Sequence, residues 1–141
     1  MTAETPFDQF DLISTAVFVL ELNQKAEPVY VAFNTSAQKL LGRPLSDYLG
    51  HTALTVYPQD YGHSVYARHC KVCDSGTPLT YQLELPLGGK TRTIRTTLCP
   101  KLDNTGKVTQ LFGSFVDITS EISAQVARVQ FDTLATEMEQ F

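Results

Sequence analysis

The sequence lacks a run of basic residues, a long apolar run and an N-terminal targeting pattern. Its 11 Lys and Arg residues are outnumbered by 15 Asp and Glu, and the net charge is −4 at pH 7. Without a basic cluster, we expect no surface that tracks nucleic-acid phosphates. No apolar stretch approaches the length of a membrane-spanning helix, and no basic segment followed by an apolar one opens the chain. We therefore expect a cytoplasmic segment with no nucleic-acid partner and no direct membrane contact.

Cysteine is also scarce. The three cysteines are an odd number without a disulfide framework, which fits a reducing compartment. Cys70 and Cys73 would share one face of a helix, but zinc needs about four ligands. Only Cys99 and the two nearby histidines could complete such a set. Because buried cysteine commonly acts as a small apolar side chain, we expect no metal site and keep metal or redox sensing as the alternative.

Catalytic motifs are missing as well. The chain contains no nucleophile–base pair, no phosphate-binding loop and no pair of acids in a catalytic signature. Gly88-Gly89-Lys90 lacks the full spacing and the following helix of a P-loop. We therefore expect no catalytic residue, and the chain is not expected to be an enzyme.

What the sequence does contain is enough apolar material for one core. Its 141 residues are 43% hydrophobic, which predicts a single domain. Residues 16–22 and 110–117 are apolar on both faces, so we expect two central strands covered on both sides. Residues 79–85 alternate apolar with polar side chains, and β-branched residues fill 91–99. With an edge strand at 29–33 and helices after it, the pattern predicts an α+β fold, a five-stranded antiparallel sheet with helices on one face.

The last strand is expected to run straight into the final helix. Apolar residues occupy both of its faces, with Val108, Phe112 and Val116 on one and Leu111 and Phe115 on the other. Asp117 and Thr119 are placed to cap the helix that begins near Ser120, because short side-chain oxygens accept from the free N–H groups of a first turn. A helix joined in this way to a central strand is a mechanical link, so we expect Asp117 and Thr119 to relay a signal.

Four motifs, in this order and spacing, resemble those of a PAS domain. They are Val29–Asn34 followed by Ala37 and Leu40–Gly42, then Tyr57–Asp60, Ser75–Pro78 and Gly113–Thr119. The resemblance covers nearly the whole chain. It implies a PAS fold with an N-terminal capping helix (residues 1–15 with the tail), a core (16–119) and a C-terminal amphipathic output helix (120–141). It also implies a sensory module of a larger signalling protein, for example a histidine kinase or diguanylate cyclase in a two-component or related system.

The same resemblance implies a ligand pocket between the long helix and the sheet. Pocket candidates are Tyr66, His69, Tyr81, Phe112 and Ser114. The ligand itself stays unknown. In the alternative interpretation, a ligand-free interaction module, side chains such as Tyr66, Tyr81 and Phe112 fill that space.

Two cofactors known from PAS domains can be compared with the sequence. His63 and His69 are candidate haem ligands, but the register between the turns at Pro58 and Gly76 matches the haem histidine of the family to Val65 instead. Flavin-binding domains of the LOV type carry a cysteine ahead of the long helix and a glutamine on the last strand. Residues 52–57 contain no cysteine, and Phe115 occupies the place of the glutamine. We expect no cofactor.

Both ends of the chain carry apolar residues that need burial. Phe7, Phe10 and Ile13 recur at helical spacing, and the final helix repeats apolar residues at steps of three and four, including Phe131, Leu134 and Met138. Ile122, Val126 and Val129 form a second stripe. We expect a homodimer built from an N-terminal helix at Phe7–Thr15 and a coiled coil of the final helices, with these residues in the interface. The alternative is a final helix that packs back on its own domain.

Overall fold

The computed structural model describes residues 15–87 and 89–139. The helix expected at Phe7–Thr15 lies, apart from its last residue, outside the described part of the chain, and so do the dimer candidates Phe7, Phe10 and Ile13. In the described part, ten elements follow one another: β1 (Ala16–Leu22), β2 (Pro28–Phe33), α1 (Thr35–Leu41), the 3-10 helix η2 (Leu45–Asp47), α2 (Ala53–Val56), α3 (Gln59–Ser75), β3 (Leu79–Leu87), β4 (Lys90–Leu102), β5 (Val108–Asp117) and α4 (Thr119–Glu139).

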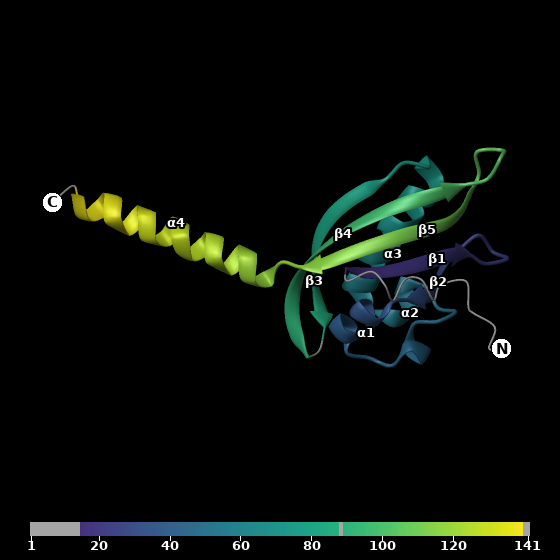
Figure 1. Cartoon of the computed structure of the whole chain (residues 1–141), viewed down its shortest axis with the longest axis horizontal. Coiled ribbons are helices and arrows are strands. Elements are labelled where there is room, and N and C mark those ends of the chain that lie inside the picture. The colour runs from purple at the N-terminus through teal and green to yellow at the C-terminus, as the bar shows by residue number, and fades with distance from the viewer. Residues whose placement is uncertain (1–14, 88, 140–141) are drawn as a thin grey trace.

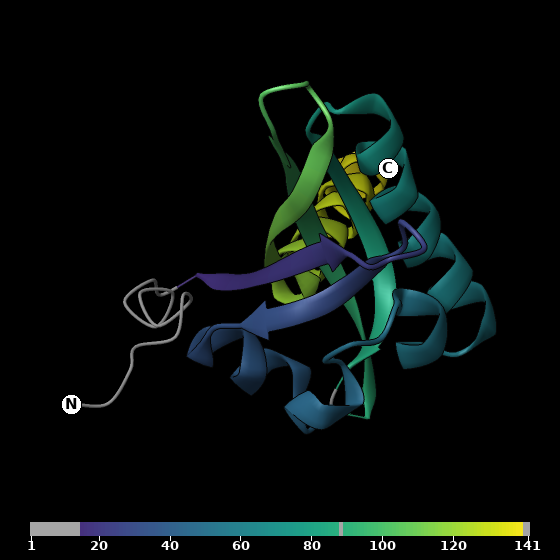
Figure 2. The ribbon, with the colours of Figure 1, turned by 90° about the vertical axis from the view of Figure 1, so that its right-hand side faces the viewer.

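The strands form one antiparallel sheet in the order β2-β1-β5-β4-β3 (Figure 1). β5 is the middle strand and β1 lies beside it, which confirms that the segments apolar on both faces are central. β2 is an edge strand, as expected. The helix α3 runs along one side of the sheet (Figure 2), and its buried Val65 and Val72 belong to the same apolar core as Leu111 and Phe115 of β5. The expected α+β architecture is therefore confirmed.

The short helix α1 begins at a side-chain cap that also joins two strands. Asn34 Oδ1 accepts hydrogen bonds from the N–H groups of Ala37 (2.9 Å) and Val17 (3.0 Å), and Asn34 Nδ2 donates to the Thr15 carbonyl (2.7 Å). One buried amide thus starts the helix and fixes the beginning of β1 against the end of β2. Gly42, with a φ of 66°, ends α1 in the left-handed conformation.

The face of β5 that points into the core differs from the expected one. Leu111, Gly113 and Phe115 are buried beneath the helices, whereas Phe112 and Ser114 are only partly buried. Since successive side chains of a strand point to opposite faces, Phe112 and Ser114 lie on the far side of the sheet. Their assignment to the pocket is therefore wrong.

The junction between β5 and α4 is built by Asp117 and Thr119 together with β4. Asp117 Oδ1 accepts from the backbone N–H (3.0 Å) and the hydroxyl (2.6 Å) of Thr119, and Asp117 Oδ2 accepts from Arg92 at 2.6 Å. The Thr119 hydroxyl in turn accepts from the Thr93 N–H at 2.9 Å, and the Ile118 N–H donates to the Thr93 carbonyl. We call these five residues the junction.

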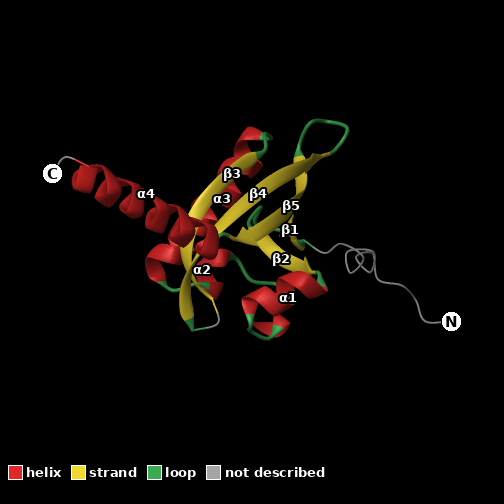
Figure 3. Cartoon of the chain, turned by 60° about the vertical axis from the view of Figure 1, so that its left-hand side comes forward, coloured by secondary structure: helices red, strands yellow, loops and turns green. Residues whose placement is uncertain are grey.

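The junction departs from the prediction in one respect. Asp117 caps the first residue of α4, as expected, but the Thr119 hydroxyl accepts from β4 instead of capping the helix. Burial alone would raise the pKa of Asp117, but the hydrogen bonds from Thr119 and the Arg92 guanidinium outweigh it and hold that pKa below its usual value. Beyond the junction, α4 points away from the sheet (Figures 1 and 3).

We predict that Asp117→Ala loosens the start of α4 more than it destabilises the core. Loss of a cap typically costs about 1 kcal/mol, a small part of the roughly 5–15 kcal/mol that stabilises a domain. Hydrogen exchange should accelerate near Ser120, with a small fall in melting temperature.

Asp132→Ala, which removes the same charge from an exposed position farther along α4, is the control for Asp117→Ala. Unchanged exchange at the start of α4 in Asp117→Ala would show that the carboxylate does not hold the junction.

Candidate functional site

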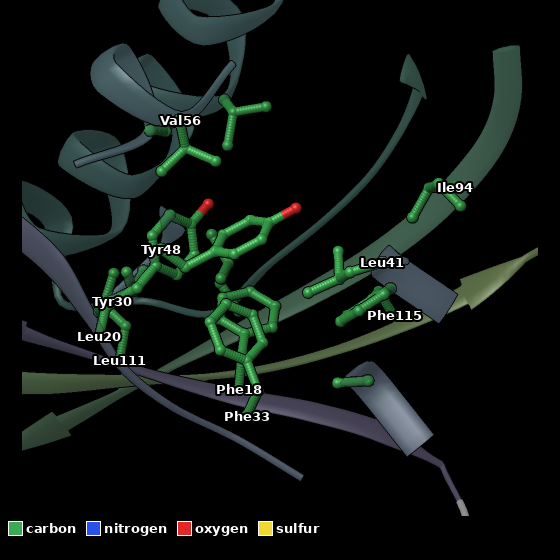
Figure 4. Close-up of a cluster of buried hydrophobic side chains, with 14 of the residues drawn as sticks. Phe18, Leu20, Tyr30, Phe33, Leu41, Tyr48, Val56, Ile94, Leu111 and Phe115 are labelled. Carbon is green, nitrogen blue, oxygen red and sulfur yellow. The ribbon is translucent and has the colours of Figure 1, made fainter. Parts of the chain in front are cut away.

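A small cavity lies inside the core, between α3 and the sheet, with a volume of about 30 Å³. Its wall contains six aromatic rings, several aliphatic side chains and two further polar residues, His69 and Thr96. The rings belong to Phe18, Phe33, Phe115, Tyr30, Tyr57 and Tyr81. Figure 4 shows the buried hydrophobic cluster to which these rings belong, with Phe18, Phe33, Tyr30 and also Tyr48 gathered above the strands. The space is large enough for water, which needs about 10–15 Å³, but not for a large ligand without movement of the wall.

His69 is the most unusual member of the wall. The side chain is fully buried on α3, and neither Nδ1 nor Nε2 has a hydrogen-bond partner among the described residues. Its ring lies 5.8 Å from the Tyr30 ring and 6.4 Å from the Phe18 ring, centroid to centroid. Burial lowers the pKa of His69 to about 3, so the imidazole is neutral and offers one donor and one acceptor. An unpaired buried polar group costs about 1–3 kcal/mol, and a molecule in the cavity can offset that cost.

The tyrosines supply hydroxyl groups without charge. Burial raises the pKa of Tyr30 well above its usual value and that of Tyr81 to about 12, and it raises the pKa of Tyr57 as well. All three phenols therefore stay protonated at physiological pH. The Tyr48 hydroxyl, in the same aromatic cluster, is buried without a partner among the described residues.

Phe18 packs directly on the backbone of β5. Phe18 and Gly113 are paired across the β1–β5 ladder, and a Cβ added to Gly113 would collide with the Phe18 ring. Only glycine therefore fits beneath this ring. The Phe18 ring also lies 5.7 Å from that of Phe115, so Phe18 fills space that would otherwise enlarge the cavity.

The cavity and the junction share the same two paired strands. Thr96 of β4 pairs with Phe115 of β5, and both residues line the cavity. Two positions along, Ile94 lines the cavity and pairs with Asp117 of the junction. Ile94 of the cavity wall is thus paired directly with Asp117, whose carboxylate holds the start of α4.

Of the predicted pocket residues, His69 and Tyr81 line the cavity. Tyr66 is partly buried on α3 and is not part of the wall. His63 is exposed, so only one of the two candidate haem ligands faces the cavity. Residues 15–87 and 89–139 contain no group of three or more side chains that could hold a metal ion, and the three cysteines are free.

Sequence reasoning missed most of the aromatic wall. Phe18, Phe33, Tyr30 and Tyr57 were assigned only to strands or motifs, because nothing local distinguishes a cavity ring from a core ring. An isolated glycine inside a strand often marks a close approach, so Gly113 was the one available sign of the Phe18 contact.

Haem and flavin do not fit the cavity. The six rings leave about 30 Å³, which is smaller than a porphyrin or an isoalloxazine ring system. Val65, the position that the register matched to the haem histidine, lines the cavity with an apolar side chain. We therefore assign no role to either group.

Neutral, buried His69 predicts a specific dependence of stability on pH. The pKa is about 3 in the folded chain and about 6.5 in an unfolded one, so below pH 6.5 the unfolded chain takes up a proton that the folded chain does not. The contribution of neutral His69 to the free energy of unfolding is fully present above pH 6.5 and is lost progressively as the pH falls below that value. Between pH 7 and pH 5 the free energy of unfolding should fall by about 2 kcal/mol more than in His69→Gln, measured with urea.

His63→Gln, on the exposed face of the same helix, is the control for the His69 titration. It should keep the pH dependence of the unaltered protein. If His69→Gln and the unaltered protein lose stability in parallel, His69 is not buried in its neutral form.

No helix in residues 15–87 and 89–139 is both long and apolar enough to cross a membrane.

No curated protein matches the chain in sequence. Solved structures do: the PAS domain of Bordetella pertussis BvgS is 18% identical with a TM-score of 0.64, over 86% of this chain and 91% of that one. The PAS domain of a Colwellia psychrerythraea protein is 15% identical with a TM-score of 0.64, over 79% and 92%.

A LOV protein of Rhodobacter sphaeroides is 16% identical with a TM-score of 0.66, over 77% of this chain and 62% of that one. Identities this low show the fold alone. A sequence model of a family described as PAS fold matches residues 10–122, well over half of the chain. The five-stranded sheet, the helices on its one face and this match together show that the protein belongs to the PAS family.

Proposed function

We propose that this PAS domain is the sensory module of a larger cytoplasmic signalling protein. In this proposal the domain binds a small ligand in its core cavity. Ligand binding is then relayed through the junction and α4 to an output domain. One observation carries the proposal: Thr96 and Phe115 of the cavity wall belong to the same paired strands as Arg92 and Asp117 of the junction. The module has no catalytic role of its own in this proposal.

The relay needs a movement of β4 and β5. A ligand that presses on the Phe115 ring or bonds to Thr96 alters the packing of the wall. The altered strand positions change the geometry around Asp117, which is two residues farther along β5. A ligand can shift this equilibrium only by the difference between its affinities for the two states.

A substitution in the cavity should therefore be felt at the junction. His69 lies on α3, far from β4 and β5 in the sequence. His69→Gln should nevertheless change the backbone amide chemical shifts of Thr93, Ile118 and Thr119. His63→Gln is the matched control and should leave these amides unchanged. Shift changes confined to α3 in the His69 variant would contradict the relay.

We also propose that the protein is a homodimer through α4. Four apolar residues of α4 are at least half exposed: Val126 (50%), Val129 (64%), Phe131 (71%) and Leu134 (57%). At 3.6 residues per turn, Phe131 and Leu134 share one face with Ala127, and Val126 and Val129 lie on the opposite face. Burial of such side chains is worth about 25 cal/mol per Å², and a symmetric pair of helices is the commonest way to obtain it. The side chain of Met138 and the residues 1–14 lie outside the description.

Replacing Phe131 and Leu134 together with Lys should give a monomer in sedimentation velocity. Thr133→Lys with Thr136→Lys adds the same charge at the same spacing on the opposite face and should leave the dimer intact. If the Thr133/Thr136 variant is a monomer and the Phe131/Leu134 variant stays a dimer, the contact lies on the Val126–Val129 face. A dimer that survives both changes, and deletion of residues 1–15, would mean that the interface lies elsewhere.

The second candidate function is a ligand-free interaction module, and the small cavity volume favours it. Native mass spectrometry with a visible spectrum of freshly purified protein separates the two. We expect a colourless protein, because the cavity wall is apolar, tyrosyl and too tight for haem or flavin. A retained Soret band or flavin absorbance would contradict that expectation, and a bound small molecule in the mass spectrum would favour the sensor.

A further inference from the structure

The polar groups on the cavity wall are all uncharged at neutral pH. They are the neutral imidazole of His69, the protonated phenols of Tyr30, Tyr57 and Tyr81, and the Thr96 hydroxyl. Among residues 15–87 and 89–139, no carboxylate, ammonium or guanidinium group belongs to the wall. The cavity can therefore pair hydrogen bonds but cannot neutralise a charge.

Two guanidinium groups that lie over tyrosine rings of the core, those of Arg43 and Arg68, already have partners outside the cavity. Arg43 donates to the Val56 carbonyl at 2.9 Å and lies 5.2 Å from the centre of the Tyr48 ring. Arg68 donates to the Ser64 carbonyl at 3.0 Å and lies 4.9 Å from the centre of the Tyr81 ring. An ionised ligand in the cavity would thus be buried without a counter-charge, which is strongly unfavourable.

The cavity excludes ionised ligands, and His69 in addition favours a ligand that forms hydrogen bonds. Both of its ring nitrogens are buried and without a partner among the described residues, and one of them must donate while the other accepts. An apolar occupant would leave both unpaired. An occupant that can both donate and accept can pair with the ring nitrogen that faces it in either tautomer, and a neighbouring hydroxyl can pair with the remaining polar atoms of the occupant.

We infer that the cavity binds a compact, uncharged molecule that both donates and accepts a hydrogen bond, and that His69 is the residue that recognises it. The inference rests on the proposed ligand-sensing function and specifies the ligand class. Compactness follows from the volume of about 30 Å³ and from the Phe18 ring, which lies against Gly113 and closes the space.

Three planar probes of nearly the same shape test the charge requirement: acetamide is neutral, acetate is an anion and acetamidinium is a cation. Binding is followed by the methyl chemical shifts of Val65, Leu85 and Ile94, which all line the cavity. Acetamide should shift these methyls with saturation, and its affinity should exceed that of each charged probe by about tenfold or more.

The role of His69 is tested on the same signals. His69→Leu should weaken acetamide binding by about tenfold, because its hydrogen bonds are lost. His69→Gln, which keeps one donor and one acceptor, should retain most of it. His63→Leu, on the exposed face of α3, should bind as the unaltered protein does. If His69→Leu does not fold, His69→Phe replaces it, since it keeps a ring at this place in the wall and removes both ring nitrogens.

Equal or tighter binding of acetate or acetamidinium at these methyls overturns the inference but leaves ligand sensing intact. Acetamide binding that is unchanged in His69→Leu, or in His69→Phe where that variant is used, overturns the recognition by His69. No response of the methyls to acetamide overturns the ligand class as a whole. The relay is tested separately: it is wrong if the amide chemical shifts of Thr93, Ile118 and Thr119 do not change in His69→Gln.

Discussion

The register between β1, β5 and β4 is the constraint on which both the cavity and the junction depend. Phe18 sits on the bare backbone of Gly113, so the pairing of β1 with β5 cannot slip by one residue without forcing a side chain into the ring. Across the next ladder, the same register sets Thr96 opposite Phe115 and Ile94 opposite Asp117. A one-residue shift would reverse the faces of a strand, moving Phe115 out of the cavity wall and Asp117 away from Arg92.

Much of the fold was predictable because it follows from local patterns. Residues that are apolar on both faces identified β1 and β5 as central strands. The same feature misled the assignment of the pocket. When both faces of a strand are apolar, alternation does not tell which face meets the helices, so Phe112 was placed in the pocket although Phe115 lines it.

The parts that sequence could not supply are those set by contacts between distant segments. His63 and His69 lie on the same helix, yet one is exposed and the other fully buried. The difference arises only when α3 packs on the sheet and places the His69 ring near those of Phe18 and Tyr30. The contact of Phe18 with Gly113 joins residues almost a hundred positions apart. The tie between Thr93 and Thr119 is likewise made across β4 and β5, which is why Thr119 reads from sequence as a helix cap and serves instead as a strand contact.

The way in which α4 leaves the sheet determines how far a small change can reach. The helix has 21 residues, a length of about 30 Å at 1.5 Å per residue, and only its first turn is tied to the domain. Tilting such a rod by about 5° at its base moves its far end by roughly 3 Å. A small rotation of the end of β5 would therefore move the C-terminal end of α4 by about the separation of two hydrogen-bonded atoms.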